Sequence, residues 1–265
     1  MSNRDRANTP MNIGFEEEQT PFESTSQRAR IWTEKWTGKW LYCPNCDNDQ
    51  VEQFENNRPA ADFFCKLCHE QYEIKSTKAT FGPKVVDGAF KTLCERLKSD
   101  TNPNFGFLSY SASDKVVRDV FVVPKQFISL KRIEERKPLS PTARRAGWIG
   151  CNILMGQIPN AGKIYVVRDG IPQPSELVRG QWKKTLFLRQ AAVEARGWLI
   201  EVMSCCDSIG KPEFEISDVY AFEATLSDLY PGNRHVKEKI RQQLQVLRDN
   251  ELLEFLGRGR YRLIR

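Results

Sequence analysis

Four cysteines between residues 43 and 68 have the spacing of a metal site. Cys43 and Cys46 form one C-x2-C pair, Cys65 and Cys68 form a second, and eighteen residues separate the pairs. Two such pairs at this separation are typical of zinc held by four thiolates. The spacing therefore predicts a structural Zn²⁺ site made of these four side chains, with His69 as an alternative ligand.

A second set of chemically active side chains is interleaved with the cysteines. Asp62 lies three residues before Cys65, and Glu73-Ile74-Lys75 begins five residues after Cys68. An acid on one strand and acid-x-lysine on the next is the layout of a magnesium-dependent phosphodiesterase centre. In such a centre two carboxylates hold Mg²⁺, and the lysine orients the attacking water or stabilises negative charge. The alternative is a set of ordinary surface charges, because acid-x-lysine strands also occur by chance.

The turn expected between Cys65 and Cys68 predicts which residues pair with Asp62 and which side chains share its face. If its two cysteines face each other across a two-residue turn, Asp62 pairs with Gln71. Side chains alternate between the faces of a strand, so Glu73 and Lys75 would then share the face of Asp62. On this hypothesis zinc holds the strand ends that position the acids.

Helices and strands alternate along the part of the chain that must position these side chains. A first helix is expected over 24–40, where Glu34 is either solvated or faces the metal centre. A second helix is expected over 85–97. Buried strands are expected over three apolar runs, at 105–110, 117–123 and 163–168. This order predicts an α/β (α+β) core with a mixed central sheet.

A basic segment rich in proline and serine, at 124–148, lies between the strands expected at 117–123 and 163–168. It is either a solvated surface loop or a loop that faces DNA. In the second case its lysines and arginines contact phosphates, and Arg144, Arg145 or Asn152 reaches base edges beside Trp148.

The C-terminal region is expected to form a separate winged-helix domain. Helices are predicted over 182–201 and 218–229, and Asn233 precedes a strongly amphipathic helix. Strands are predicted over 251–255 and 261–264, around a glycine-arginine turn. In winged-helix proteins the last helix enters the major groove and the wing contacts the backbone. The predicted DNA contacts are Arg234, His235, Lys237, Arg241, Arg258 and Arg260.

The composition is that of an ordinary globular protein, with 40% hydrophobic and 28% charged residues. A net charge of +6 over 265 residues leans only mildly toward polyanionic partners. No signal-peptide pattern and no membrane-spanning stretch is present, so we expect a cytoplasmic protein that does not bind membranes. Reduced thiols in that compartment favour metal over disulfides for the paired cysteines. The remaining cysteines, Cys94, Cys151, Cys205 and Cys206, are expected to be small core residues.

Four runs of sequence resemble DpnI-type restriction endonucleases: FENNRP at 54–59, RKPLSPTARRAGWIGCNI at 136–153, KEKIRQQLQ at 237–245 and GRGRYR at 257–262. The resemblance extends from about residue 26 to 262. It implies a PD-(D/E)xK nuclease domain with a structural zinc, followed by a winged helix. We therefore expect a disordered tail over 1–23, the nuclease domain over 24–190 and the winged helix over 191–265.

The same resemblance implies an activity and a set of site residues. The expected activity is Mg²⁺-dependent cleavage of both strands of GATC, only when its adenine is N6-methylated, by a monomer. By position, Asp62, Glu73 and Lys75 match the catalytic motif, and Asp62, Glu73 and Ile74 are the expected Mg²⁺ ligands. The proline and acid of the motif are separated here, as Pro59 and Asp62.

Two questions stay open at the level of the sequence. Trp148 either forms an apolar wall for the adenine methyl group or anchors its loop by hydrophobic contact. The function also has two alternatives to a methyl-directed endonuclease. One is a zinc-containing winged-helix regulator without nuclease activity, and the other is a structure-directed repair nuclease.

Overall fold

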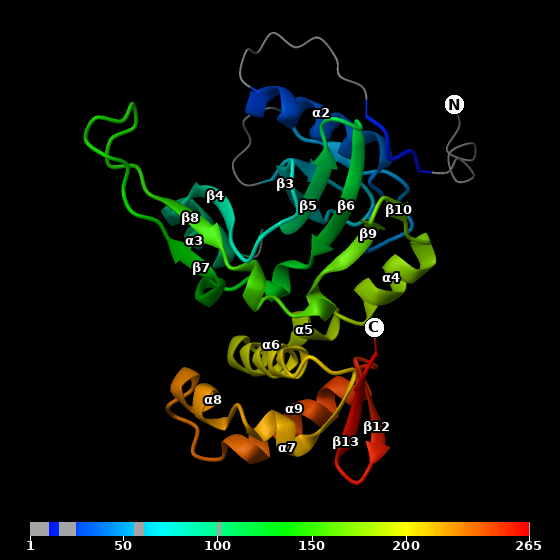
Figure 1. The fold of residues 1–265 in the computed structure, drawn as a ribbon, viewed down its shortest axis with the longest axis vertical. Helices are drawn as coiled ribbons and strands as arrows, with labels where there is room; N and C mark the ends of the chain where they lie inside the picture. Colours follow the sequence, from blue (N-terminus) through cyan, green and yellow to red (C-terminus); the bar gives the residue numbers. More distant parts are fainter. Residues whose placement is uncertain (1–10, 16–24, 56–60, 100–101, 265) are drawn as a thin grey trace. The chain divides into compact units, whose positions relative to one another are not determined.

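The computed structural model describes residues 11–15, 25–55, 61–99 and 102–264 (Figure 1). Most of the expected tail, the first expected helix cap at Ser24 and the end of the FENNRP run lie outside these ranges. The chain divides into two compact units, Met1–Gly156 with Lys163–Trp182, and Gln157–Gly162 with Lys183–Arg265. Within the described ranges, no helix is both long and apolar enough to cross a membrane.

A seven-stranded, strongly twisted sheet forms the core of the first unit, in the order β1-β2-β3-β5-β6-β9-β10 (Figure 1). The strands are β1 (Glu52–Gln53), β2 (Phe63–Phe64), β3 (Gln71–Thr77), β5 (Asn104–Ser111), β6 (Val116–Val123), β9 (Ile164–Arg168) and β10 (Ile171–Pro172). β3 and β5 are parallel, and the other neighbours are antiparallel. All of β5 is buried, as expected for a strand covered on both faces. The three apolar runs predicted as strands are therefore confirmed.

Helix α2 (Thr25–Trp40) packs against β3 and confirms the predicted first helix. Its residues Ala29 and Trp36 are buried, and the Thr33 hydroxyl lies 3.2 Å from the Ser76 hydroxyl on β3. Residues 11–15 run beside β6, where the amide of Val117 donates to the carbonyl of Ile13 at 2.7 Å. This part of the expected tail is therefore packed against the sheet.

A second, three-stranded sheet in the order β4-β8-β7 lies in the same unit. It consists of β4 (Val85–Ala89), β8 (Gly150–Ile153) and β7 (Ile133–Glu135), and α3 (Phe90–Leu97) follows β4 directly. The helix expected over 85–97 was thus wrong in its first five residues. Two adjacent valines followed by Asp87 and Gly88 form helix poorly and pair with β8 instead. Val86, expected on the apolar face of a helix, is 61% exposed.

Short helical turns and one further helix complete the regular structure up to residue 183, where the chain passes between the two units. They are η1 (Lys125–Phe127), η2 (Leu130–Arg132), η3 (Met155–Gln157), η4 (Asn160–Gly162) and α4 (Ser175–Lys183). Val178 and Trp182 are buried on α4.

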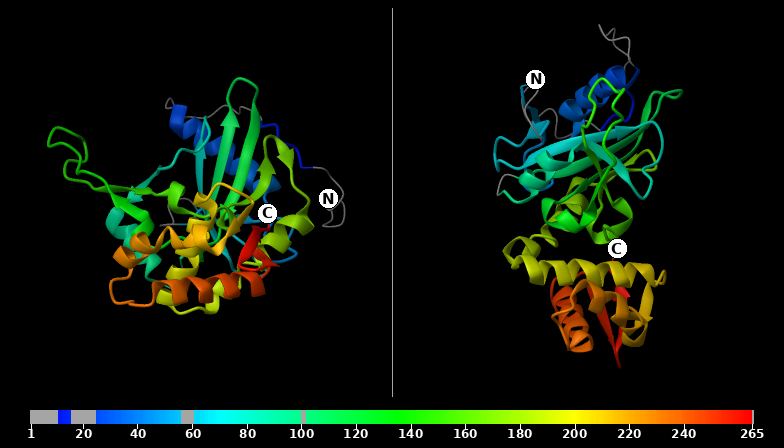
Figure 2. Two further views of the ribbon diagram at one scale, coloured as in Figure 1. Left: turned by 60° about the horizontal axis from the view of Figure 1, so that its bottom comes forward. Right: turned by 90° about the vertical axis from the view of Figure 1, so that its left-hand side faces the viewer.

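The second unit has the element order of a winged helix (Figure 2). Its elements are α5 (Phe187–Gln190), α6 (Val193–Ser208), β11 (Glu213–Glu215), α7 (Ile216–Tyr220), α8 (Glu223–Leu229), α9 (Val236–Asp249), β12 (Leu253–Gly257) and β13 (Arg260–Leu263). The strands form a sheet in the order β11-β13-β12. α9 buries Val236, Ile240, Leu244 and Leu247, as its periodicity predicted.

The other two helices predicted in this region are divided into shorter pieces. The run expected as one helix over 182–201 comprises the end of α4, α5 and the start of α6, with extended backbone at Ala191 and Ala192. The run over 218–229 is split between α7 and α8 at Ala221 and Phe222. Alanine favours helix intrinsically, so tertiary packing overrides local propensity at both breaks.

Candidate functional site

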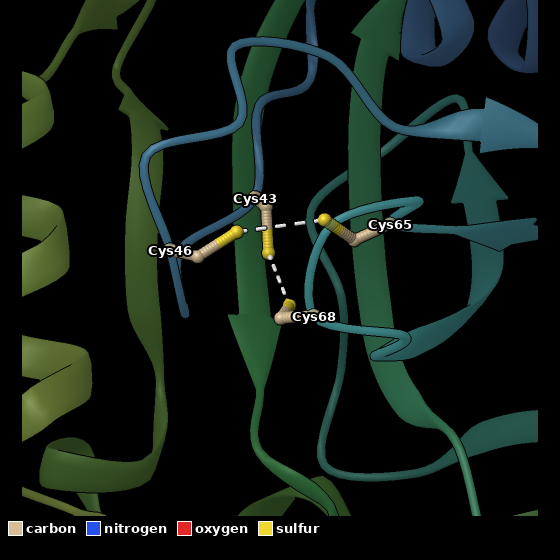
Figure 3. A group of neighbouring side chains, drawn as sticks. All are labelled: Cys43, Cys46, Cys65 and Cys68. Atoms are coloured by element: carbon tan, nitrogen blue, oxygen red, sulfur yellow. Dashed lines mark hydrogen bonds between the residues drawn. The ribbon is translucent and has the colours of Figure 1, made fainter.

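Four cysteine side chains from two loops point toward one another in the first unit (Figure 3). The sulfur atoms of Cys43, Cys46, Cys65 and Cys68 all lie within 4.8 Å of one another. Two of the distances, Cys43 to Cys68 and Cys46 to Cys65, are 3.5 Å. Thiolates bound at about 2.3 Å around a tetrahedral Zn²⁺ ion are spaced by about 3.8 Å. The cysteines predicted from their spacing therefore come together as a group that could bind zinc.

Polar neighbours surround these thiols. The Asn48 side-chain amide donates to Cys65 Sγ at 3.2 Å, and the Tyr72 hydroxyl lies 3.1 Å from Cys43 Sγ. Burial raises the pKa of Cys65, but hydrogen bonds from the Cys68 backbone and Asn48 outweigh it and lower that pKa to about 7. Burial raises the pKa of the Cys43 and Cys46 thiols, so Cys65 ionises more readily than these two, and metal binding by the group would release protons. The alternative ligand His69 is exposed and is not one of the convergent group.

The turn between the second cysteine pair is longer than predicted, and this changes the register of the acids. The Cys65 amide donates to the Glu70 carbonyl at 2.8 Å, and His69 takes the left-handed conformation, at φ 61°. β2 and β3 consequently pair Phe63 with Tyr72 and Phe64 with Gln71, and the Asp62 amide donates to the Tyr72 carbonyl at 2.9 Å. The predicted pairing of Asp62 with Gln71 was therefore wrong by two residues. An even shift preserves which side chains share a face.

A cleft of about 580 Å³ contains all three predicted catalytic residues. The amide of Ile74 donates to Asp62 Oδ2 at 2.7 Å, which fixes that carboxylate across the strand pair. Lys75 Nζ donates to Glu73 Oε1 at 2.5 Å. Asp62, Glu73 and Lys75 are thus brought together, on strands that begin at the cysteine group.

Charged side chains of both signs line this cleft, with Glu34, Asp62 and Glu73 acidic and Arg30, Lys75 and Lys84 basic. Burial raises the pKa of Glu73. The Lys75 ammonium lowers this pKa, and the nearby Asp87 and Asp62 carboxylates raise it, so that the pKa of Glu73 lies above its usual range. Burial lowers the pKa of Lys75, but Glu73 and Asp87 outweigh it and raise that pKa above its ordinary value. The carboxylate oxygens of Asp62 and Glu73 are the kind of ligand that a hard cation such as Mg²⁺ prefers. The residues present therefore fit a divalent cation.

Helix α2 adds further polar side chains to the cleft. Glu34 accepts hydrogen bonds from Arg30 Nε at 2.5 Å and from Gln53 Nε2 at 3.0 Å. Arg30 Nη2 also lies 3.6 Å from Asp62 Oδ1. Of the two possibilities for Glu34, the structure places it facing the cleft. Neither Arg30 nor Gln53 was predicted, because no local pattern distinguishes them from other surface residues.

Asp87 on β4 is a buried neighbour of the cleft that sequence reasoning missed. It is 7% exposed, and its Oδ1 accepts a hydrogen bond from Lys75 Nζ. Asp87 was missed because residues 85–97 were all assigned to a helix, whereas 85–89 form β4. The pattern Val85-Val86-Asp87-Gly88, a β-branched pair followed by an acid and a glycine, is the signal that could have found it.

The predicted DNA-facing loop is an extended arm between β7 and β8 (Figure 1). Arg144 and Arg145 are exposed on it, and the Arg145 guanidinium lies 4.8 Å from the centre of the Trp148 ring. The ring packs over Gly150, where an added Cβ would come within 2.8 Å of it. Asn152 lies within β8 and donates to Glu134 Oε2 at 2.8 Å. The first three residues therefore share the arm, whereas Asn152 belongs to the sheet.

The predicted contacts of the second unit lie at the start of α9 and on the β12–β13 hairpin (Figure 2). Arg234 and His235 are exposed immediately before α9. Lys237 forms an ion pair with Glu223 at 3.2 Å, and Arg241 is bonded to Glu238 at 2.9 Å.

The wing itself carries two arginines with no ion-pair partner within the described residues, Arg258 and Arg260. Arg262 differs, because it pairs with Glu213 at 2.7 Å and with Glu254 at 2.9 Å. The wing therefore presents positive charge at its turn and neutralised charge further along β13.

Comparison with known families identifies both units. Residues 11–191 match the DpnI family model, described as the Dam-replacing family, and residues 194–263 match DpnI_C, described as the Dam-replacing HTH domain. These matches define the class as a restriction-type nuclease with a C-terminal winged helix that binds DNA. The chain belongs to the Dam-replacing family of DpnI-type proteins, which confirms the resemblance seen in its sequence.

Proposed function

We propose that this protein is a Mg²⁺-dependent PD-(D/E)xK endonuclease that cuts both strands of GATC when the adenine is N6-methylated. The observation that carries the proposal is the single cleft lined by Asp62, Glu73 and Lys75. Membership of a restriction-nuclease family supports DNA hydrolysis. The methylated target is supported by the long sequence runs shared with DpnI-type enzymes.

Asp62 and Glu73 are the proposed metal-binding groups. Both side chains line the cleft, and the Ile74 amide, next to Glu73 in the chain, donates to Asp62 Oδ2. When bound there, Mg²⁺ supplies positive charge to the scissile phosphate and lowers the pKa of a coordinated water. Asp62 is held in place by the Ile74 amide, so one of its oxygens is already oriented before substrate arrives.

Lys75 is the proposed partner of the attacking water. Its ammonium lies beside Glu73, where it can orient the water and stabilise the negative charge that develops on the phosphate oxygens. In the reaction a water oxygen bonds to phosphorus and gives up a proton, the bond from phosphorus to a sugar oxygen breaks, and the departing oxygen takes up a proton.

Trp148 is the proposed apolar wall for the adenine methyl group. Replacing it with alanine should lower the preference for methylated over unmethylated sites by about fivefold per methyl group, since burial of a methyl-sized group stabilises by roughly 1 kcal/mol. Cleavage rates on matched plasmids measure the preference. The partly buried Trp40 on α2 offers a control, because Trp40→Ala should leave the preference unchanged. An unchanged preference in Trp148→Ala would assign methyl recognition to other residues.

The turn of the wing is proposed to contact DNA phosphates. The double variant Arg258→Ala, Arg260→Ala should weaken binding and reduce the slope of log affinity against log salt by about 2, one for each lost phosphate contact. Fluorescence anisotropy over a salt series measures both quantities. Arg262→Ala is the matched control, because the Arg262 charge is already neutralised by two glutamates. Equal losses in both proteins would argue against a phosphate contact at the turn.

The decisive experiment is cleavage of one plasmid prepared with and without adenine methylation at GATC, in Mg²⁺ and in EDTA. The proposal expects Mg²⁺-dependent cutting of the methylated plasmid alone. Cutting of both plasmids would keep the nuclease and reject methyl direction. Binding without cutting would favour a winged-helix regulator in which the acids are structural.

A further inference from the structure

Asp87 contacts Lys75 from the second sheet and has unusual hydrogen bonding. Its side chain is 3% exposed, and Oδ1 accepts hydrogen bonds from Lys75 Nζ and from the Gly88 amide, the latter at 2.6 Å. Oδ2 is buried without a hydrogen-bond partner in the described part of the chain. An unpaired buried carboxylate oxygen costs folding free energy, and such groups concentrate at functional sites. This cost indicates a role for Asp87 beyond packing.

A β-bulge aims this carboxylate at Lys75. β4 pairs Asp87 with Cys151 and then Ala89 with Gly150, so that Gly88 is an extra residue in the ladder. Bulges beside active sites commonly re-aim a side chain. The orientation of Asp87 is therefore built into the backbone of the second sheet and does not depend on a mobile loop.

Asp87 reaches the cleft only through Lys75. The residues of β4 that line the cleft are Val85 and Val86, whereas Glu73 and Lys75 line it from β3. Asp87 is not among the residues that line the cleft, and the hydrogen bond that it accepts from them comes from Lys75. A second metal site between Asp87 and Glu73 is disfavoured as well, because the Lys75 ammonium is bonded to both carboxylates.

The charges of Glu73 and Lys75 indicate what Asp87 does. Glu73 is the counter-ion of Lys75, and under the proposed function it is also a metal ligand. Once Glu73 shares its charge with a divalent cation, the ammonium requires another negative partner to remain beside that cation. We propose that Asp87 is the positioning residue that holds Lys75 in place during catalysis. This inference rests on the proposed nuclease activity.

The test is the isosteric variant Asp87→Asn, compared with wild type, Lys75→Met and the double variant. Loss of Asp87 leaves a neutral Glu73–Lys75 pair, so the variant should fold with an unchanged melting temperature. At saturating Mg²⁺ and methylated DNA we expect kcat to fall by about 10²-fold with KM unchanged, since misplacing a catalytic group costs about that factor. In the Lys75→Met background, Asp87→Asn should cause no further loss. Asp114→Asn, in the β5–β6 turn, is the control and should cut normally.

Each result bears on the inference separately from the nuclease proposal. Wild-type activity in Asp87→Asn, or an independent loss in the Lys75→Met background, would overturn the positioning role while the wild-type enzyme still cuts DNA. A wild-type protein that does not cut would overturn both proposals. If Asp87→Asn proves unfolded by circular dichroism, Asp87→Glu decides the question. Because it keeps the charge, it should retain activity within about tenfold of wild type, and a larger loss of kcat in a folded protein would contradict the inference.

Discussion

Replacing Glu73 with glutamine should abolish cleavage while leaving methylated DNA bound. The amide keeps the size of the side chain but removes the charge that attracts Mg²⁺ to the cleft. Metal assistance is worth several kcal/mol of transition-state stabilisation, so we expect the rate to fall by about 10³-fold or more. Single-turnover cleavage with Mg²⁺ measures the rate, and a gel-shift assay without added Mg²⁺ measures binding.

Glu52→Gln is a suitable control for this variant. Glu52 lies on β1 of the same sheet, but it is solvent-exposed in part and pairs with Lys66 at 2.8 Å outside the cleft. It should cut DNA at the normal rate. If Glu73→Gln also cut normally with Mg²⁺, the catalytic cation would have to bind elsewhere, and the role proposed for the cleft would be rejected.

Replacing Cys43 with serine should destabilise the first unit severely. A structural zinc site contributes about 10 kcal/mol or more to folding, which is comparable with the whole stability of a typical domain at about 5–15 kcal/mol. We expect the purified variant to contain less than one zinc per chain, to lose its sharp melting transition and to lose cleavage. Elemental analysis, thermal melting and the plasmid assay measure these three quantities.

Cys94→Ser separates loss of zinc from loss of a thiol. Cys94 lies on α3, is partly exposed and is not among the convergent cysteines. Its serine variant should keep both zinc and activity. A Cys43→Ser protein with full zinc content and an unchanged melting temperature would show that the four cysteines do not form a structural metal site.

These two predictions are linked by the geometry of the second cysteine pair. Asp62 lies three residues before Cys65, and the pairing that begins at Cys65 and Glu70 continues through β2 and β3 to the Asp62 amide, which donates to the carbonyl of Tyr72. Loosening the turn should therefore disturb the acids as well as the fold. Chelators that remove zinc should inactivate the enzyme in a way that Mg²⁺ alone does not reverse.

Several features were determined by the sequence alone because they depend on short-range spacing. Two C-x2-C pairs can converge only if both turns fold back, and the four thiols do so. The shared face of Asp62, Glu73 and Lys75 survived a wrong register, because the alternation of side chains along a strand depends only on whether the shift is even. The apolar face of α9 followed from its helical period in the same way.

Other features were decided only by tertiary structure, because they depend on contacts between distant segments. The residues 85–89 are compatible with helix or strand locally, and pairing with β8 selects the strand and brings Asp87 to Lys75. Arg30 joins the cleft because α2 packs on β3. Spacing specifies which side chains can act together within one strand or turn. The packing of separate elements, which no local pattern encodes, determines which further side chains surround them.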